Sequence, residues 1–573
     1  MMDAMPRQFA ARRGLSLAYQ GKTLLSLIDP IGQAERAVDA KPKLSRTLYF
    51  CPSPLYGYGL ERLLEQIDPD SAVLGVETDG KLMDLSLHNL TPFLAAHPRF
   101  RLVRTQDPAS LCTFVRDTWG SRVFRRVSRV RLNGGWQLAP DLYDALEEAL
   151  RKDMATGWGN AMTLVKLGRR YITNALRNLA HIPRSRNIKA LSYGSQGVLV
   201  LGAGPSLDSL LPALIRHFGG LLAEEKRPFR IICVDTALQA LRSWNIKPDL
   251  AVALESQHWN LRDFIGLRSW NIPAAMDLSA LPATADVLGT KPYLFFTPWT
   301  QLRLFDRLGV AGLLPAALPP LGSVGLTAVS LARTLTQGPV ITGGIDFSFF
   351  PDAFHARSTP GHEERLRLQN RIHPLIRGDT AYRRGSRQAR SKSGVLVRTD
   401  TVMQNYRDLF EREFSQDAQI SDIIGSGLPL GSRLLDMAEG FRLLAESPPP
   451  PPPDAETAPA IQPPESRIIN SAERFRPRTS LPAMDAAAFI RRERETLERL
   501  RDMLTGTRAV QGPELEWLLD EMDYLWAHFP ECAATEGRRP PASDISFLKR
   551  VRVEIDPAVK ILNQDLAALA ALI

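Results

Sequence analysis

A glycine turn near the middle of the chain holds the first residues whose types and spacing could serve chemistry. Residues 198–201 form a short apolar run bounded by glycines, which predicts a buried strand. The turn that follows carries Gly202, Gly204, Pro205 and Ser206. The leucines beyond it predict a helix, whose first N–H groups and positive dipole end would suit a phosphate. The dinucleotide-binding pattern lacks its last glycine here, so spacing alone leaves nucleotide binding and an ordinary strand–helix turn equally open.

Polar residues also close the strands predicted after this turn. One strand ends at Asp235 and Thr236, and the next ends at Glu255. A later helix start rich in small residues contains Ser323, and a further strand ends in two glycines and Asp346. In a doubly wound parallel sheet such ends share one edge, where ligands bind. The elements that must position these residues are therefore the strands and helices of an α/β, Rossmann-like domain.

These blocks, in this order, resemble the central domain of the motility accessory factor (Maf) flagellin glycosyltransferases. That domain is also called MptE-like, after the archaeal 6-hydroxymethylpterin diphosphokinases, and it is similar to bacterial sialyltransferases that use CMP-sialic acid. The resemblance covers about residues 186–440. It implies a CMP-activated sugar as the donor substrate, flagellin as the acceptor protein, no permanently bound cofactor and no essential metal.

The resemblance also implies roles for individual residues of the site. The glycine turn matches the nucleotide turn of the sialyltransferases, and Asp235 and Glu255 fall where those enzymes have asparagines that contact the nucleotide. Maf relatives typically have acids at both places. The sialyltransferase base is a histidine just before the next helix, but residues 393–399 contain none, so His355 is the best substitute. We take His355 and Asp346 as candidate catalytic residues. The candidate donor-binding residues are Gly202, Gly204, Pro205, Ser206, Asp235, Thr236, Glu255 and Ser323.

The stretch from 350 to 400 is the most polar part of this domain. It has poor apolar periodicity between 377 and 394, which predicts a mobile loop or lid. Its arginines could neutralise a diphosphate, a phosphate diester or the carboxylate of a nonulosonic acid. A solvated loop without a role is the alternative. The basic residues are His355, His362, His373, Arg357, Arg365, Arg367, Arg371, Arg377, Arg383, Arg384, Arg387 and Arg390.

Composition places the chain among soluble globular proteins. Its 573 residues are too many for a single hydrophobic core, which predicts two or three domains. Its net charge of +9 suits an acidic or phosphorylated ligand and does not require nucleic acid as a partner. An arginine-rich stretch at 116–131 has few aromatic residues, which favours a solvated face over a nucleic-acid patch. The four cysteines lack metal spacing, and neither a membrane span nor a signal-peptide core appears, so we expect a cytoplasmic protein.

A run of six prolines at 448–453 marks the clearest domain boundary. Before the central domain, a second strand–turn–helix–strand pattern predicts a smaller α/β domain, which could be a second nucleotide site or a degenerate domain that positions partners. After the prolines, apolar residues at helical spacing predict a helical region. The expected boundaries are 1–45 for a lead-in, 46–150 for the N-terminal Rossmann-like domain, 151–185 for connecting helices, 186–446 for the central domain, 447–482 for the linker and 483–573 for the C-terminal helices.

Three functions remain open from the sequence. The first is transfer of a nonulosonic, sialic-acid-like sugar from its CMP derivative to serine or threonine of flagellin. The second is pyrophosphoryl transfer from ATP to a pterin alcohol, which would need magnesium. The third is a non-catalytic flagellin-binding or assembly factor, which the missing lid histidine favours.

Overall fold

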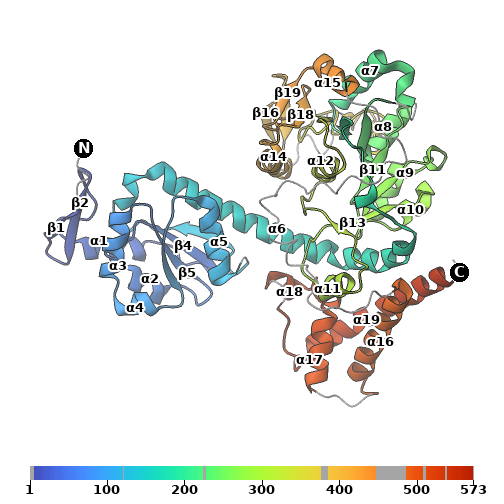
Figure 1. Cartoon of the computed structure of the whole chain (residues 1–573). Coiled ribbons are helices and arrows are strands. Elements are labelled where there is room, and N and C mark those ends of the chain that lie inside the picture. The colour runs from blue at the N-terminus through green and yellow to red at the C-terminus, as the bar shows by residue number, and fades with distance from the viewer. Residues whose placement is uncertain are drawn as a thin grey trace. The chain divides into compact units, whose positions relative to one another are not determined.

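The computed structural model describes residues 5–120, 122–223, 227–375, 385–446, 485–507, 512–535 and 538–571 (Figure 1). The chain forms two compact units. Unit 1 combines residues 1–168 with 526–541, and unit 2 combines residues 169–525 with 542–573. The expected proline linker, 447–482, lies outside the described residues, as do Arg377, Arg383 and Arg384 of the expected lid.

Unit 1 is built on a four-stranded parallel sheet in the order β6-β5-β4-β7. Its two central strands, β4 and β5, are buried along their whole length, as their continuous apolar sequences predict. The strands are β4 (Thr47–Pro52), β5 (Ala72–Glu77), β6 (Phe100–Arg104) and β7 (Arg126–Arg129). The helices are α2 (Leu60–Gln66), α3 (Gly80–Asn89), α4 (Pro92–Ala96) and α5 (Pro108–Trp119), with a 3₁₀ turn at Gly135–Leu138.

Within the expected irregular lead-in at 1–45, the described residues 5–45 instead form a helix and strands of unit 1. Residues Leu17 and Tyr19 are fully or nearly fully buried, and they pack with Leu55 and Leu82 in one apolar cluster. Short strands with one exposed edge carry too weak an alternation to be read from sequence, which is why this sheet was missed. Its elements are β1 (Arg7–Ala10), β2 (Leu15–Tyr19), β3 (Lys22–Thr23) and the helix α1 (Pro30–Asp39).

One continuous helix, α6 (Pro140–Asn178), takes the place of the separate connecting helices expected from the sequence. Its 39 residues include three glycines, which lower helix propensity but do not break the helix. Residues up to 168 belong to unit 1 and those from 169 belong to unit 2. The helix ends in a 3₁₀ segment at Leu179–Arg184.

Unit 2 contains a ten-stranded parallel sheet in the order β14-β13-β12-β11-β10-β9-β15-β18-β19, with β8 paired to β13. The chain proceeds from β9 outward to β14 on one side and then returns to β15 on the other side of β9. The strand order therefore reverses between β9 and β15, where doubly wound sheets bind their ligands. The strands are β8 (Arg186–Asn187), β9 (Val198–Leu201), β10 (Arg230–Val234), β11 (Leu250–Ala253), β12 (Ala274–Asp277), β13 (Tyr293–Phe296), β14 (Ala316–Ala317), β15 (Val340–Gly343), β18 (Ile420–Ile423) and β19 (Arg433–Leu435).

Helices cover this sheet, and α12 packs against β9, β10, β11 and β15. A two-stranded antiparallel hairpin, β16 (Arg387–Arg390) and β17 (Leu396–Thr399), lies beyond the main sheet. The helices are α7 (Leu207–Phe218), α8 (Leu238–Ser243), α9 (Leu261–Phe264), α10 (Ala283–Leu288), α11 (Arg303–Val310), α12 (Val324–Leu335), α13 (Pro360–Leu368), α14 (Thr401–Phe414) and α15 (Met437–Ala445). The 3₁₀ turns are Ile188–Ala190, Gly219–Ala223, Asp235–Ala237, His258–Asn260 and Arg268–Trp270.

The C-terminal region is helical, as predicted. Its longest helices, α16 and α19, pack against each other and against the 3₁₀ segment after α6, while α17 contacts α11 (Figure 1). The short helix α18 belongs to unit 1, although the sequence analysis placed it with the other C-terminal helices. No helix among the described residues is long and apolar enough to cross a membrane. The elements are α16 (Ala486–Thr505), α17 (Gly512–Glu521), a 3₁₀ turn at Asp523–Leu525, α18 (Pro530–Ala534) and α19 (Ile545–Ala570).

Candidate functional site

The glycine turn after β9 lies directly against the loop after β15, at the point where the strand order reverses. The Gly202 N–H donates to the Gly343 carbonyl, and the Gly204 N–H donates to the Gly344 carbonyl, both at 2.8 Å. A Cβ on Gly202 would lie 2.3 Å from the Gly344 oxygen. The glycines are therefore required for the close approach of two backbone segments.

Asp346 holds the start of α7. The Ser206 N–H donates to Asp346 Oδ2 at 2.7 Å, and the Ser206 hydroxyl donates to Asp346 Oδ1 at 2.5 Å. Only 3% of Asp346 is exposed. Its carboxylate thus occupies the place on the first turn of α7 that the sequence analysis assigned to a donor phosphate. This geometry gives Asp346 a role in positioning the start of α7, and the catalytic role that we predicted for it stays a prediction.

A buried ion pair that the sequence analysis missed stands beside this turn. Lys392 Nζ lies 2.5 Å from Asp422 Oδ2, and both side chains are almost completely buried. Asp422 also accepts a hydrogen bond from the Thr342 hydroxyl at 2.8 Å. Burial raises the pKa of Asp346, and the nearby Lys392 ammonium opposes that rise. Lys392 therefore compensates two buried carboxylates at the strand ends.

Replacing Gly202 with alanine should destabilise unit 2 by at least about 1–3 kcal/mol, the usual range for overpacking. The added methyl group would meet the Gly344 carbonyl, which belongs to the backbone and cannot rotate away. Hydrogen exchange of peptides covering β9 and β15 measures the loss. Gly220→Ala is the matched control because no atom lies within 4 Å of its Cβ position. Equal exchange in both variants would contradict the close-approach argument.

The acidic residues predicted at the ends of β10 and β11 have different environments. Asp235 is buried, and its two oxygens accept hydrogen bonds from the Thr236 N–H at 2.8 Å and from Asn260 Nδ2 at 2.9 Å. Glu255 is exposed and accepts a hydrogen bond from the Gln257 N–H at 3.0 Å. Asp235 therefore fixes the local loop, whereas Glu255 and the half-buried Thr236 remain accessible to a ligand.

The last turns of α6 hold the loops after β11 and β12 through two buried asparagines. Asn174 Nδ2 donates to the carbonyls of Ser256 and Ser279, at 3.0 and 3.1 Å. Asn178 Nδ2 donates to the carbonyls of Leu278 and Ala280, at 2.8 and 2.9 Å. The two asparagines are four residues apart and share one helix face. They fix the loop that carries Glu255.

An aromatic group lies near the same loops. The rings of Tyr171 and Trp299 are 5.1 Å apart. Burial raises the pKa of Tyr171 to about 12, and the charge of Glu255 adds to the rise. The influence of Glu255 shows that Tyr171 is near this acidic residue. Aromatic faces next to an exposed carboxylate could contact the base and ribose of a nucleoside.

The N-terminus of α12 lies at the carboxyl end of the sheet, because α12 leads into the parallel strand β15. Ser323 is its N-cap residue, is half-buried, and makes no side-chain capping bond. Gly322 has a φ of +68°, and a Cβ there would lie 3.7 Å from the Tyr406 hydroxyl. Of the two helix starts that hold predicted donor-binding residues, this one is uncapped, while Asp346 already caps α7.

His355 lies on the loop that leads to α13. The Ala356 N–H next to it donates to the Ala203 carbonyl at 2.9 Å, which ties this loop to the glycine turn. The Arg357 N–H donates to Asp208 Oδ1 at 2.8 Å. Burial lowers the pKa of the half-buried His355 to about 4, and Arg365, Arg262 and His362 lower it further. The structure thus brings His355 to the carboxyl edge of the sheet as an uncharged imidazole at neutral pH.

Asp263 on α9 is a second buried titratable group at this edge. It is 5% exposed and lies three positions after Asn260, so the two side chains share a face of the turn. Burial raises the pKa of Asp263 to about 7; the charge of Asp235 adds to this rise and Arg262 opposes it. The sequence offered no signal for this residue, because an aspartate in a short polar segment is ordinary.

The acid at the end of a central strand in unit 1 accepts hydrogen bonds from its own domain. Glu77, fully buried at the end of β5, accepts hydrogen bonds from the Ser53 hydroxyl, the Leu55 N–H and the Ser86 hydroxyl at 3.0–3.3 Å. Burial raises the pKa of Glu77 to about 7, and these hydrogen bonds oppose the rise. In a nucleotide site this carboxylate would contact the ribose. Its present contacts favour the structural interpretation of this domain.

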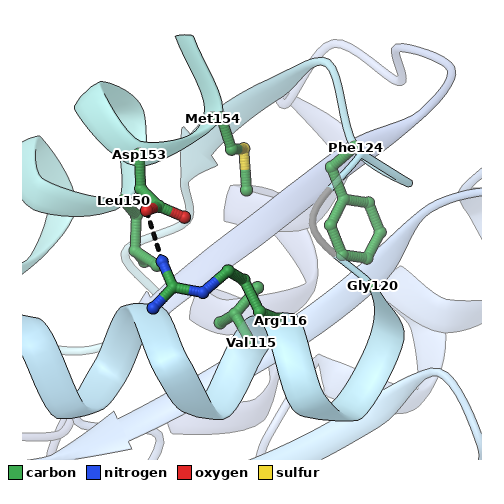
Figure 2. A pocket seen from close by; sticks show the side chains of 7 residues that line it. All are labelled: Val115, Arg116, Gly120, Phe124, Leu150, Asp153 and Met154. Carbon is green, nitrogen blue, oxygen red and sulfur yellow. Dashed lines mark hydrogen bonds and ion pairs between the residues drawn. The ribbon is translucent and has the colours of Figure 1, made fainter. Parts of the chain in front are cut away.

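A small pocket in unit 1 lies between α5 and α6 (Figure 2). The Arg116 and Asp153 side chains form an ion pair at 2.5 Å across it. The remaining lining residues are Val115, Gly120, Phe124, Leu150 and Met154. With an apolar lining and its charges already paired, the pocket offers no polar group to a nucleotide, so it does not compete with the edge of the unit 2 sheet.

Comparison with known proteins identifies the domain that holds this edge. Residues 173–352 match the family model described as 6-hydroxymethylpterin diphosphokinase MptE-like. This segment is therefore similar to the MptE-like family. It includes the glycine turn, the loops after β10 and β11, and Ser323, whereas His355 and Lys392 lie beyond its end.

Two whole-chain relatives extend the comparison. The chain is 28% identical over 570 residues to a protein of Treponema pallidum (strain Nichols) that is described as uncharacterized, with 98% of this chain and 95% of that protein covered. The fold of this chain is similar to that of the Maf glycosyltransferase from Magnetospirillum magneticum AMB-1, with a TM-score of 0.52 and 14% identity. That match covers 99% of this chain and 93% of the solved one. The predicted resemblance to Maf and MptE-like proteins and the predicted α/β fold are confirmed.

Proposed function

We propose that this protein is a glycosyltransferase that moves a nonulosonic, sialic-acid-like sugar from a CMP-sugar donor to serine or threonine hydroxyls, with flagellin as the acceptor protein. The observation that carries the proposal is the uncapped N-terminus of α12 at the carboxyl edge of an MptE-like sheet, with Ser323 and Tyr406 beside it. The fold shared with a Maf glycosyltransferase supports the reaction class.

In this proposal the donor's phosphate binds at α12 and its nucleoside lies toward the loops after β10 and β11. Ser323 and the first amides of α12 would hold the phosphate, because a helix N-terminus favours an anion. Thr236 and Glu255 would contact the ribose hydroxyls. Pro205 and Ser206, with the two glycines of their turn, would shape the floor of the site and would not contact the phosphate.

The transfer step needs a proton acceptor but no cofactor beyond the donor. The acceptor hydroxyl oxygen would attack the anomeric carbon, and CMP would leave with the electron pair of the broken carbon–oxygen bond. His355 would take the hydroxyl proton, since its imidazole is uncharged at neutral pH. Asp263 is the other candidate proton acceptor at this edge. Activity that survives His355→Gln but is lost in Asp263→Asn would transfer the role to Asp263.

The first test is thermal-shift titration of the full chain with CMP, CDP and ATP, each with and without magnesium. CMP at a hundredfold excess over its Kd should stabilise the folded state by about 2.7 kcal/mol and raise the melting temperature without magnesium. Ser323→Ala should weaken this rise. Ser330→Ala is the matched control, because Ser330 is a half-buried serine on the same helix, away from its N-terminus. No shift with any nucleotide would sink the proposal.

The name of the matched family favours pyrophosphoryl transfer to a pterin alcohol as the second candidate. That reaction needs carboxylates that converge on magnesium and a diphosphate. The oxygens of Asp235 and Asp346 already accept hydrogen bonds from the chain, which weighs against this function. Stabilisation by ATP only in the presence of magnesium would support it. CMP binding without transfer to flagellin would instead support a non-catalytic flagellin-binding factor.

A further inference from the structure

A point above Gly361, the second residue of α13, lies between two nitrogen atoms that come from different elements. The position that a Cβ on Gly361 would take is 3.6 Å from His355 Nδ1 and 3.8 Å from Arg262 Nη2. Apart from Pro360, His362 and the backbone of α13 itself, no other described atom lies within 4 Å of it. The absence of a side chain therefore leaves space that an imidazole and a guanidinium both face.

The start of α13 leaves hydrogen-bonding capacity at the same place. Thr359 is the N-cap residue, but its hydroxyl donates to the Ala356 carbonyl at 2.7 Å and caps no amide. Pro360 has no N–H, so Gly361 supplies the first amide of this nine-residue helix. The positive end of the helix dipole adds to the attraction for an anion.

A buried histidine supplies an independent observation. His362 is 8% exposed, and its Nδ1 atom has no hydrogen-bond partner among the described residues. A buried polar atom without a partner is costly, which indicates a missing ligand or water. His362 directly follows Gly361 in the chain, and its charge acts on both His355 and Asp208. Its side chain therefore belongs to the same cluster as the space above Gly361.

We propose that His355, Arg262, His362 and the N-terminus of α13 form a binding subsite for an anionic oxygen group, a carboxylate or a phosphate, above Gly361. Guanidinium, imidazole and backbone N–H groups are the donors that such anions take in proteins. Arg262 can serve because its Nη1 atom pairs with the exposed Glu364 at 2.6 Å, while Nη2 faces the space.

Occupancy of this subsite should change the basicity of His355. The charged groups around it are Arg262 on α9, His362, Glu364 and Arg365 on α13, Asp208 on α7, and Arg357 on its own loop. Cations nearby lower the pKa of a histidine, and an anion placed among them raises it. Binding of the anion would therefore bring the pKa of His355 back toward neutrality. In the transfer reaction proposed above, on which this last step rests, the donor itself would activate the base.

The test is histidine NMR on the full chain, labelled at the imidazole Cε1 carbons, with the His355 signal assigned from the spectrum of His355→Gln. The pKa of His355 is measured in chloride, then with sodium phosphate and with sodium acetate as probes. We expect phosphate, acetate or both to raise it by about one unit or more, the shift that corresponds to tenfold in proton affinity. A response to phosphate alone assigns a phosphate site, and a response to acetate alone assigns a carboxylate site.

Two variants make the measurement specific. Gly361→Asp places a carboxylate at the proposed position, where an acid near a helix start is well tolerated. It should raise the pKa of His355 without a probe and abolish the response to phosphate. Gly512→Asp adds the same charge at the start of α17, where no atom lies within 4 Å, and should change neither quantity. Gly361→Ala, with φ outside the left-handed region, is the fallback that fills the space without adding charge.

Two results would overturn the subsite. The first is a His355 pKa that neither probe moves. The second is an equal response to phosphate in the wild type and in Gly361→Asp, which would show general screening. Neither outcome depends on turnover, so failure of the subsite is distinguishable from failure of the transferase proposal. A chain that responds to phosphate but transfers no sugar would keep the subsite and lose the proposed function.

Discussion

Replacing Lys392 with methionine should destabilise the sheet of unit 2 by about 3–5 kcal/mol, the range for removing one partner of a buried ion pair. Lys392 and Asp422 are 1% and 0% exposed at the side chain, so water cannot replace the lost ammonium. Asp346 lies close enough for Lys392 to influence its pKa, and it would lose the same compensation. Methionine keeps the length of the side chain, so the loss reports charge more than packing.

Hydrogen exchange of peptides that cover β15 and β18 is the appropriate measurement, because a chain of two compact units does not unfold as a single two-state system. Exchange of peptides from β4 and β5 in unit 1 serves as the internal control. The double variant Lys392→Met, Asp422→Leu should recover much of the loss, since it removes both charges together. A single Lys392→Met variant whose β15 peptides exchange like the wild type would contradict this account.

The loss of stability in the Lys392→Met variant should also depend on pH. Burial raises the pKa of Asp422 in the folded state, and Lys392 opposes that rise. Without the lysine the folded-state pKa should increase further. A carboxyl group with a raised folded pKa favours folding when protonated, and this contribution is lost as pH rises. The variant should therefore come closer to the wild type at pH 5 than at pH 8.

The sequence was informative wherever one segment determines its own structure. An apolar run bounded by glycines predicted β9, an apolar run that ends in an acid predicted β10, and the acids that follow the strands predicted which ends would share an edge. Such patterns depend on local burial, which a single segment encodes. The family resemblance added the order of the blocks, and the fold comparison confirmed it.

Roles that depend on pairing between distant segments could not be predicted. Register places Thr342 of β15 beside Asp422 of β18, eighty residues away, and only this pairing encloses Lys392. From sequence alone, Lys392 is one more cation in a basic, weakly periodic stretch. Asp346 was correctly recognised as a strand-end acid, but its role at the start of α7 was missed because only the fold of the loop after β15 places it on Ser206. Spacing along the chain cannot distinguish a carboxylate that binds a ligand from one that caps a helix.

The interface between the domain of the ten-stranded sheet and the C-terminal helices, both within unit 2, depends on one arginine of α11. Arg307 Nη2 lies 2.5 Å from Glu493 on α16, and Nη1 lies 2.9 Å from Glu521 on α17. The side chain of Glu493 is 4% exposed. The Arg303 N–H donates to Asp523 Oδ2 at 2.9 Å, so the start of α11 is held by the same helical region.

Replacing Arg307 with alanine should therefore weaken the docking of α16 by about 3–5 kcal/mol, because Glu493 would stay buried without its cationic partner. Peptides from α11, α16 and α17 should exchange faster, while those from β9 and β15 should change little. Arg442→Ala is the matched control: Arg442 pairs with Glu446 at 3.4 Å, but both side chains are about 60% exposed. An exposed pair of this kind contributes about 0.3–0.5 kcal/mol.

The Arg307 variant should also become less stable as pH rises. Burial raises the pKa of Asp523 to about 7, while the Arg303 N–H and the charge of Arg307 hold it down. Removing Arg307 should raise this pKa further, so ionising Asp523 would cost more in the folded state than in the unfolded state. Adding Glu493→Gln to the Arg307→Ala variant distinguishes the effects of Glu493 and Asp523. The double variant should restore much of the docking at pH 6, where Asp523 is largely protonated, and less at pH 8. A recovery that is the same at both pH values would assign the whole effect to Glu493 and exclude Asp523 from the interface.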